Sequence, residues 1–234
     1  MPICHPRRVP RTTGARRLRA ITRRLDAAYG KPPAARRLPP IDELVLTILS
    51  QNTSDVNRDR AYADLRRAFP TWTAVARAPA RGIARAIRRG GLSATKAPRL
   101  RAALRTLEAR GMELDAPRAL AELPDAELWE VLVGLPGVGP KTAACVLLFS
   151  LDRPYLPVDT HVHRAAIRLG LVDERSSAVR AQEELQAAVP PDLVYAFHMG
   201  LIRHGRAVCV ARRPLCSECV LADLCPRVGV TTSR

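Results

Sequence analysis

The sequence predicts an all-α protein. Apolar residues recur at three- and four-residue spacing along most of the chain, while the alternating pattern of a half-buried strand is almost absent. Glycine and proline interrupt these segments, so the helices are expected to be short and separated by turns. Hydrophobic residues make up 47% of the 234 residues, which is enough for a packed core. No apolar run is long enough to span a membrane.

The first helix is expected over residues 15–30, where apolar side chains recur one turn apart and Gly30 provides a stop. A proline-rich linker, KPPAARRLPP, follows it. A second helix then begins at Asp42, whose carboxylate can cap it. That helix carries an apolar stripe and ends in the polar segment SQNTSD, residues 50–55. A third helix is expected as far as Phe69.

Short helical segments broken by glycine and proline are expected from residue 70 onward, followed by a longer helix over 96–110. Residues 124–150, PDAELWEVLVGLPGVGPKTAACVLLFS, predict two further helices joined by a tight turn. Asp125 can cap the first of these helices, and the turn LPGVG ends it. This segment is therefore predicted to be a helix–hairpin–helix.

The turn of this hairpin has the residues of a phosphate-binding site. Gly137 and Gly139 permit a tight turn and close approach of another backbone, and Pro140 suits the first position of a helix. Backbone N–H groups at such a turn, beside a helix N-terminus, can bind one DNA phosphate without reading sequence. A bare Gly-x-Gly turn would favour an ordinary αα-hairpin, but the longer pattern LPGVGxKTA is far more specific.

The net charge of +16 favours a polyanionic partner, nucleic acid first. Residues 1–24 carry eight arginines and no acidic residue, yet the rest of the chain is also basic. A solvated basic surface is the alternative. Residues 1–14 are expected to form a disordered basic arm. The N-terminus lacks the apolar region of a secretory signal, so the expected location is the cytoplasm, at the nucleoid.

The motif LPGVGPKTA, followed by PVDTHVHR at residues 157–164, resembles the helix-hairpin-helix DNA glycosylases of the endonuclease III type. The resemblance covers the chain from about residue 15 to about residue 230. It implies that Lys141, the lysine after the hairpin, is the nucleophile. It also implies that Asp159, the aspartate of the VDTH run, is the essential carboxylate.

These residue types suit the chemistry of base removal. A neutral amine can attack the sugar C1′ and form a Schiff base, which permits β-elimination at the 3′ phosphate. Lys141 falls in the first turn of its predicted helix, where the helix N-terminus and partial burial disfavour the ammonium form. Asp159 can cap the helix that follows it and, as an ionised carboxylate, stabilise positive charge on the sugar. Surface phosphate binding and capping alone are the plainer alternatives, and His161 and His163 are expected to be structural.

Four of the six cysteines fall within seventeen residues, in a C-x6-C-x2-C-x5-C pattern that indicates metal ligation: Cys209, Cys216, Cys219 and Cys225. Their spacing alone leaves zinc and an iron–sulfur cluster open. The resemblance implies a [4Fe–4S] cluster with a structural role, because HGRAVCVARRPLCSECVLADLC is similar to the C-terminal cluster loop of that family.

The remaining arginines and cysteines are interpreted from their positions in the sequence. Arg212 and Arg213, between the first two ligands, are expected to contact DNA phosphates. Cys4 and Cys145 are not expected to be ligands.

The resemblance also implies how a damaged base is reached, since such enzymes flip it out of the stack and fill the gap. SQNTSD is similar to the segment that inserts a glutamine there. That position is Asn52, with Gln51 just before it, so the shorter amide puts the range of lesions or the preference for the opposite base in question. GGLSATKA, residues 90–97, matches the loop that inserts an apolar wedge. Leu92 is the expected wedge, with an ordinary core position as the alternative, and Lys96 is expected to contact a phosphate.

Together these features predict a monomeric DNA glycosylase and AP lyase that acts on oxidised pyrimidines in duplex DNA. Residues 42–150 are expected to form a six-helix barrel domain carrying the hairpin. Residues 15–41 together with 151–234 are expected to form the iron–sulfur cluster domain. Lys141 and Asp159 are expected on facing walls of the cleft between them.

Three other functions are compatible with parts of the sequence. An adenine-mismatch glycosylase of the same superfamily is disfavoured by Lys141 and by the short segment after the cysteines, because such enzymes usually lack the lysine and carry a further C-terminal domain. A hairpin DNA-binding module without catalysis is a second alternative. An electron carrier is a third, but it explains neither LPGVGPKTA nor VDTH.

Overall fold

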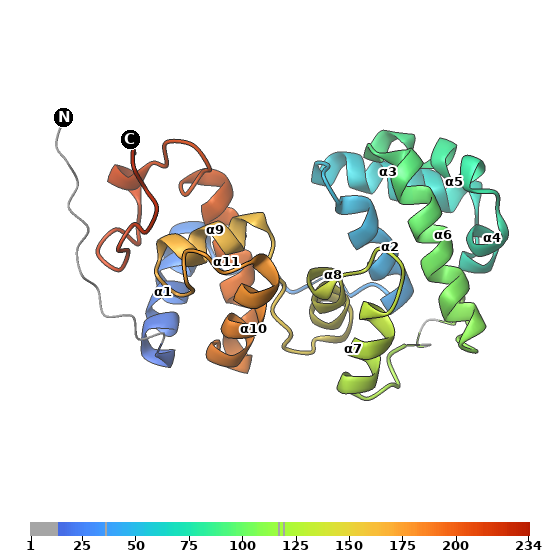
Figure 1. The fold of residues 1–234 in the computed structure, drawn as a ribbon, viewed down its shortest axis with the longest axis horizontal. Helices are drawn as coiled ribbons and strands as arrows, with labels where there is room; N and C mark the ends of the chain where they lie inside the picture. The colour runs from blue at the N-terminus through green and yellow to red at the C-terminus, as the bar shows by residue number, and fades with distance from the viewer. Residues whose placement is uncertain (1–13, 36, 117, 119) are drawn as a thin grey trace. The chain divides into compact units, whose positions relative to one another are not determined.

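The computed structural model describes residues 14–35, 37–116, 118 and 120–234. Within these ranges every regular element is a helix and no strand occurs, so the predicted all-α class is confirmed (Figure 1). Apart from Gly14, the predicted basic arm lies outside the described residues. None of the helices in the described ranges is long and apolar enough to cross a membrane.

The chain divides into two compact units. The first, here the cluster unit, takes the described residues up to Ala34 together with Pro154–Arg234. The second, here the hairpin unit, is Ala35–Arg153. These boundaries lie a few residues from those that the sequence predicts.

Two contacts explain why the observed unit boundaries differ from the predicted ones. The Ser150 hydroxyl donates to the Leu38 carbonyl at 2.6 Å, and Arg37 pairs with Asp152 at 2.5 Å. The linker after residue 34 is therefore held against the end of the hairpin rather than against the helix before it.

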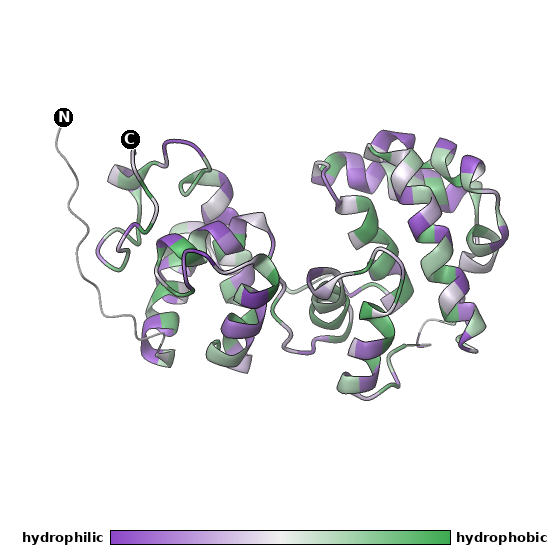
Figure 2. Ribbon diagram, viewed as in Figure 1, coloured by the Kyte–Doolittle hydropathy of each residue, from purple (hydrophilic) through white to green (hydrophobic). Residues whose placement is uncertain are grey.

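The hairpin unit is built around α2, the most apolar helix of the unit in Figure 2, which packs on α3, α6 and α8. Most α2 side chains are buried, as expected of a helix that is covered on nearly all sides. The other helices of the unit form its remaining layers. The elements of this unit are α2 (Pro40–Ser50), α3 (Asp55–Ala68), α4 (Trp72–Arg77), α5 (Ala80–Ala86), the 3-10 turn η1 (Arg88–Gly90), α6 (Ser93–Ala109), α7 (Asp125–Val133), α8 (Pro140–Cys145) and the π-helical turn η2 (Val146–Ser150).

Two predicted helix caps in this unit are wrong. Helix α2 begins at Pro40, so Asp42 lies inside its first turn and instead accepts hydrogen bonds from the Tyr62 hydroxyl (2.5 Å) and Trp72 Nε1 (3.0 Å). Asp125 is the first residue of α7 and pairs with Arg153 at 3.0 Å. Both helices start directly after or at a proline, which has a preset φ and no N–H to satisfy.

The cluster unit consists of α1 (Ala15–Tyr29), α9 (Thr160–Arg168), α10 (Ala178–Ala188), the 3-10 turn η3 (Pro191–Leu193), α11 (Val194–Ala207) and the 3-10 turn η4 (Cys216–Glu218). Helix α11 packs on α1 and on α9, and α9 packs on α10. Helices α1 and α11 approach closely, because a Cβ added at Gly200 would lie 3.0 Å from the Leu25 Cβ. Helix α1 ends at Tyr29 with Gly30 as its C-cap, so Gly30 is the stop that the sequence predicts.

Candidate active site and nucleic-acid interface

Lys141 is the second residue of α8, the helix that follows the hairpin turn. Pro140 takes the first position, and the Gly139 carbonyl accepts the N–H groups of Thr142 (2.9 Å) and Ala143 (3.0 Å) to start the helix. The side chain of Lys141 is half-buried. The predicted position in the first turn of a helix is thus where the structure places this lysine.

The two glycines of the turn differ in what they allow. Gly137 has φ 77°, and a Cβ there would lie 2.9 Å from Cδ of Arg99, so only glycine fits without a shift. Gly139 has φ −104°, and a Cβ there would meet no atom within 4 Å. Both glycines are exposed. The predicted close approach therefore occurs at Gly137, while Gly139 faces open space at the start of a helix, where an anion is favourably bound.

A buried carboxylate of α2, Glu43, lies in the same unit as Lys141 and is a residue that the motifs did not reveal. It is 7% exposed and accepts a hydrogen bond from the Thr47 hydroxyl at 3.0 Å. Burial raises the pKa of Glu43 to about 7, even though the charges of Arg58 and Lys141 act to lower it. An acidic residue directly before the apolar run LVLTIL was the available signal.

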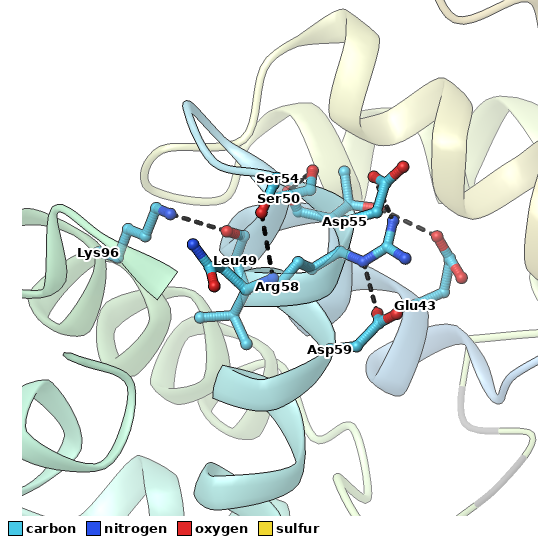
Figure 3. A network of polar contacts seen from close by, with 10 residues as sticks. Glu43, Leu49, Ser50, Ser54, Asp55, Arg58, Asp59 and Lys96 are labelled. Carbon is cyan, nitrogen blue, oxygen red and sulfur yellow. Dashed lines mark hydrogen bonds and ion pairs between the residues drawn. The ribbon is translucent and has the colours of Figure 1, made fainter. Parts of the chain in front are cut away.

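The positive charge of Arg58, on the first turn of α3, acts on the Glu43 carboxylate. Its guanidinium pairs with Asp55 at 3.2 Å and with Asp59 at 2.8 Å, as Figure 3 shows. The Ser54 hydroxyl accepts the backbone N–H of Asn57 and caps the same helix. The polar segment between α2 and α3 is thus anchored at its C-terminal end, where α3 begins, by charge pairs and a cap.

Asp159 caps α9, as the sequence predicts. Its Oδ1 accepts the backbone N–H of His161 at 2.9 Å and that of Val162 at 2.8 Å. The histidines serve local structure: His161 Nδ1 contacts the Arg164 guanidinium at 3.1 Å, and His163 Nε2 contacts the Ser176 carbonyl at 2.8 Å. Asp159 belongs to the cluster unit and Lys141 to the hairpin unit, so their facing one another across a cleft stays a prediction.

The four predicted cysteine ligands line one cavity of the cluster unit. The cavity walls are otherwise mainly apolar: Ala165, Leu169, Val208, Leu215, Leu221 and Val230. Among the described residues no three His, Cys, Asp or Glu side chains are close enough together to hold a single metal ion. Four thiols spread around a mainly apolar cavity fit a cluster, in which each thiolate binds a different iron, better than one zinc ion. Cys145 is buried on α8 and is no part of this set, and Cys4 lies outside the described residues.

Arg168 and His204 support the cysteine loop, although no motif pointed to them. The Arg168 guanidinium donates to the Cys209 sulfur at 3.4 Å and to the Val210 carbonyl at 2.7 Å. His204 Nε2 lies 3.6 Å from the Cys219 sulfur. Hydrogen bonds of this kind orient ligands and tune a metal group.

The loop that follows Cys209 carries two arginines of the predicted DNA interface. Arg168 also donates to the Ala211 carbonyl at 2.9 Å, so the backbone just before Arg212 is held in place. Arg212 and Arg213 are both exposed. The structure therefore presents both side chains to solvent from an anchored loop.

Residues predicted to enter the duplex lie at two turns of the hairpin unit. Asn52 is exposed with φ 51°, between α2 and α3, and Gln51 beside it is half-buried. Leu92 is 55% exposed with φ 49°, directly before α6. Leu92 is therefore no core residue, which supports its interpretation as a wedge.

Lys96 is not at the surface, where a phosphate contact would need it. Only 2% of the residue is exposed, and its ammonium donates to the carbonyls of Leu49 and Gly90, each at 2.7 Å. The sequence contained the reason, because Lys96 falls one turn before Leu100 on the buried face of α6. The predicted phosphate contact of Lys96 is therefore wrong.

The fold and the site define a helix-hairpin-helix DNA-repair protein with a metal-cluster loop, and comparison with known proteins identifies its family. The family model of the HhH-GPD superfamily base excision DNA repair protein matches residues 45–191. The family model of the iron–sulfur binding domain of endonuclease III matches residues 209–225. The chain therefore belongs to the HhH-GPD superfamily of base excision DNA repair proteins.

Relatives and solved structures agree with this assignment. Endonuclease III of Thermotoga maritima is 34% identical over 191 residues, which are 80% of this chain and 82% of that protein. A putative DNA glycosylase of Arabidopsis thaliana is 34% identical over 200 residues, 81% of this chain but 65% of that longer protein. The solved trapped covalent intermediate of endonuclease III with DNA is similar over 92% of this chain and 95% of that one, at 25% identity and a TM-score of 0.77.

These matches settle the class of the protein and its cofactor. The chain is a base-excision DNA glycosylase of a family to which AP lyase activity belongs. Its cofactor is the predicted [4Fe–4S] cluster.

Proposed function

We propose that this protein removes oxidised pyrimidines from duplex DNA and cleaves the strand 3′ to the abasic site, acting as a monomer at the nucleoid. One observation carries the proposal: Lys141 stands in the first turn of α8, directly behind the open turn at Gly139. A primary amine beside an anion-binding turn can meet a sugar whose phosphate the turn holds. The similar structure of a trapped endonuclease III–DNA intermediate supports a covalent route.

Binding precedes the chemistry. Backbone N–H groups of the turn containing Gly137 and Gly139 bind one phosphate, and Arg212 and Arg213 bind others, none of them reading sequence. Base removal also requires the nucleotide to leave the stack. Leu92 then occupies the space opened in the duplex, as an exposed leucine held ahead of α6 can do.

The covalent step begins with the Lys141 amine. Its nitrogen lone pair attacks the sugar C1′ as the bond to the base breaks, and the electrons of that bond leave with the base, which takes up a proton. Loss of the proton on nitrogen and opening of the ring give a Schiff base. Removal of a C2′ proton then expels the 3′ phosphate by β-elimination. The Asp159 carboxylate stabilises the positive charge that develops at C1′.

The iron–sulfur cluster is held by Cys209, Cys216, Cys219 and Cys225 and supplies a structural crosslink rather than a reactant. Its loop carries Arg212 and Arg213 between the first two ligands. Burial raises the pKa of the Cys225 thiol to about 11, so this thiol would have to give up a proton to bind the cluster.

Borohydride trapping tests the proposal. The wild-type protein, mixed with a duplex that carries one oxidised pyrimidine, is expected to form a covalent adduct when the Schiff base is reduced. Lys141→Gln should give no adduct and no strand cleavage while its duplex affinity stays within a few fold. Lys31→Gln, at an exposed lysine of the cluster unit, is the matched control and should trap like the wild type. Undiminished trapping by Lys141→Gln would refute the assignment.

A further inference from the structure

Lys96 is a buried cation held between two backbone carbonyls, and the mechanism above does not use it. Nζ lies 2.7 Å from the Leu49 oxygen and 2.7 Å from the Gly90 oxygen. Burial lowers the pKa of Lys96, and no carboxylate of the described residues offsets this. Burying a charge costs folding free energy. We therefore expect the two hydrogen bonds of Lys96 to hold specific segments of the chain in place.

The first partner is the C-terminal end of α2. The last carbonyls of a helix have no partner within it, and the helix dipole places partial negative charge there. Inside α2 the Ser50 hydroxyl donates to the Thr47 carbonyl at 2.7 Å, but the Leu49 carbonyl receives its hydrogen bond from Lys96, on α6 (Figure 3). The cation therefore closes the helix end from which the polar turn departs.

The second partner is the end of η1. Gly90 is buried against α3, where a Cβ in its place would lie 3.0 Å from the Ala61 Cβ. Its carbonyl points to the same ammonium as the Leu49 carbonyl. One nitrogen thus joins the chain just before Gly91 and Leu92 to the chain just before Gln51 and Asn52.

Each of these points is the start of a turn that carries one exposed non-glycine residue in the left-handed region. Here residues 51–54 are the plug loop, with Asn52 at φ 51°, and residues 91–92 are the wedge loop, with Leu92 at φ 49°. A left-handed backbone is strained for a non-glycine residue, so it persists where the surroundings fix it. The bonds to Lys96 fix one end of both loops.

We propose that Lys96 is a positioning residue which ties the plug loop and the wedge loop into one rigid element, so that Asn52 and Leu92 enter the duplex together. This inference rests on the proposed function, because it concerns how that function reaches its base. Without the tie each loop still exists, but the two insertions must be ordered separately at the moment of binding. Lys96 acts on the distortion of the duplex and leaves the Schiff-base chemistry untouched.

Three substrates separate these steps in single-turnover experiments with the full-length, cluster-loaded protein. The first is a duplex with one oxidised pyrimidine opposite adenine. The second carries the same lesion opposite a missing nucleoside, so that no opposing base has to be displaced. The third is a single strand with an abasic site, which needs no insertion and reports trapping by Lys141 alone.

Lys96→Met keeps an unbranched side chain that is one atom shorter and removes both its charge and its donors. We expect its excision rate to fall by about tenfold or more on the intact duplex, because small misplacements cost rates of that order. The deficit should shrink to within a few fold on the second substrate and vanish on the third. A fluorescent base analogue beside the lesion should show less unstacking with Lys96→Met than with the wild type. Lys31→Met, at an exposed lysine, should match the wild type throughout.

Equal losses on all three substrates, or no loss on the intact duplex, would overturn the inference. Should Lys96→Met not fold, Lys96→Gln goes through the same series. A measurement that leaves Lys96 intact adds to this: Asn52→Ala and Leu92→Ala are expected to cost less together than the product of their separate effects, and a multiplicative result speaks against the tie. If the wild type traps nothing even on the abasic strand, the proposed function has failed, and not the role of Lys96.

Discussion

One oxygen of Asp159 makes both capping bonds of α9, since Oδ1 accepts the N–H groups of His161 and Val162. The second oxygen makes no hydrogen bond within the described residues. The carboxylate can therefore serve the helix with one atom and face the sugar with the other. This division of labour separates a structural role from a catalytic one and makes the two testable by different substitutions.

Asp159→Asn should keep the cap and lose the catalytic charge. Asparagine caps helices about as well as aspartate, so thermal stability should change little, while the rate of base removal should fall on the order of 100-fold. Asp159→Ala is the matched variant and should in addition lose about 1 kcal/mol of stability, measured by thermal unfolding. Normal turnover by Asp159→Asn would leave the carboxylate with capping as its only role.

Alanine substitutions at the two hairpin glycines should have different effects. Gly137→Ala forces a side chain into a left-handed backbone beside Arg99 and should cost about 1–2 kcal/mol of stability as well as DNA affinity. Gly139→Ala meets no protein atom within 4 Å, so its stability should be unchanged. Its methyl group would stand where the phosphate is bound, so duplex affinity should still fall. Full affinity in Gly139→Ala would place the phosphate elsewhere.

The sequence predicts most of what depends on local rules. The helix periodicity, the cap at Asp159 and the place of Lys141 after a proline all follow from spacing and propensity within a few residues. Two failures are also local, because prolines start α2 and α7 and displace the predicted caps at Asp42 and Asp125. The other failures depend on contacts between distant segments. Lys96 belongs by motif to an exposed loop, but α6 turns it inward, and the exceptional environment of Glu43 arises only when α3 and α8 cover α2.

Glu43 should make stability fall as pH rises. Its pKa is about 7 in the folded protein against 4.5 for an unperturbed glutamate side chain, so the folded state holds a proton that the unfolded chain releases. Stability is then highest below pH 4.5, decreases through the window up to pH 7 and stays lower above it, by about 3 kcal/mol for this group.

Glu43→Gln tests this sign, because a glutamine side chain keeps the acceptor for Thr47 and does not titrate. The difference between the unfolding temperature of Glu43→Gln and that of the wild type should become more positive as the pH is raised from mildly acidic to mildly alkaline. The control is Glu183→Gln, at an exposed position of α10. Parallel profiles for Glu43→Gln and the wild type would mean that the acid is ionised at little cost.

Cluster loading should depend on Cys219 and not on Cys145. Cys219 lines the cavity with three other thiols, whereas Cys145 is buried on α8 in the other unit. Cys219→Ser should lower bound iron and the visible absorbance of the cluster, while Cys145→Ser should retain both. Iron analysis of the purified variants makes the comparison. Full iron content in Cys219→Ser would show that three cysteines suffice.

Arg212 and Arg213 should reveal themselves in the salt dependence of DNA binding. Each phosphate contact contributes about 0.9 to the slope of log affinity against log salt, so replacing both by alanine should reduce that slope by about 2. Arg175→Ala with Arg180→Ala removes the same charge from exposed positions elsewhere in the cluster unit and should change the slope little. Affinity should fall alike for damaged and undamaged duplexes, because phosphate contacts carry no base information. Equal slopes for the two double variants would mean that the arginines act only through net charge, and that the loop pinned by Arg168 does not touch the backbone.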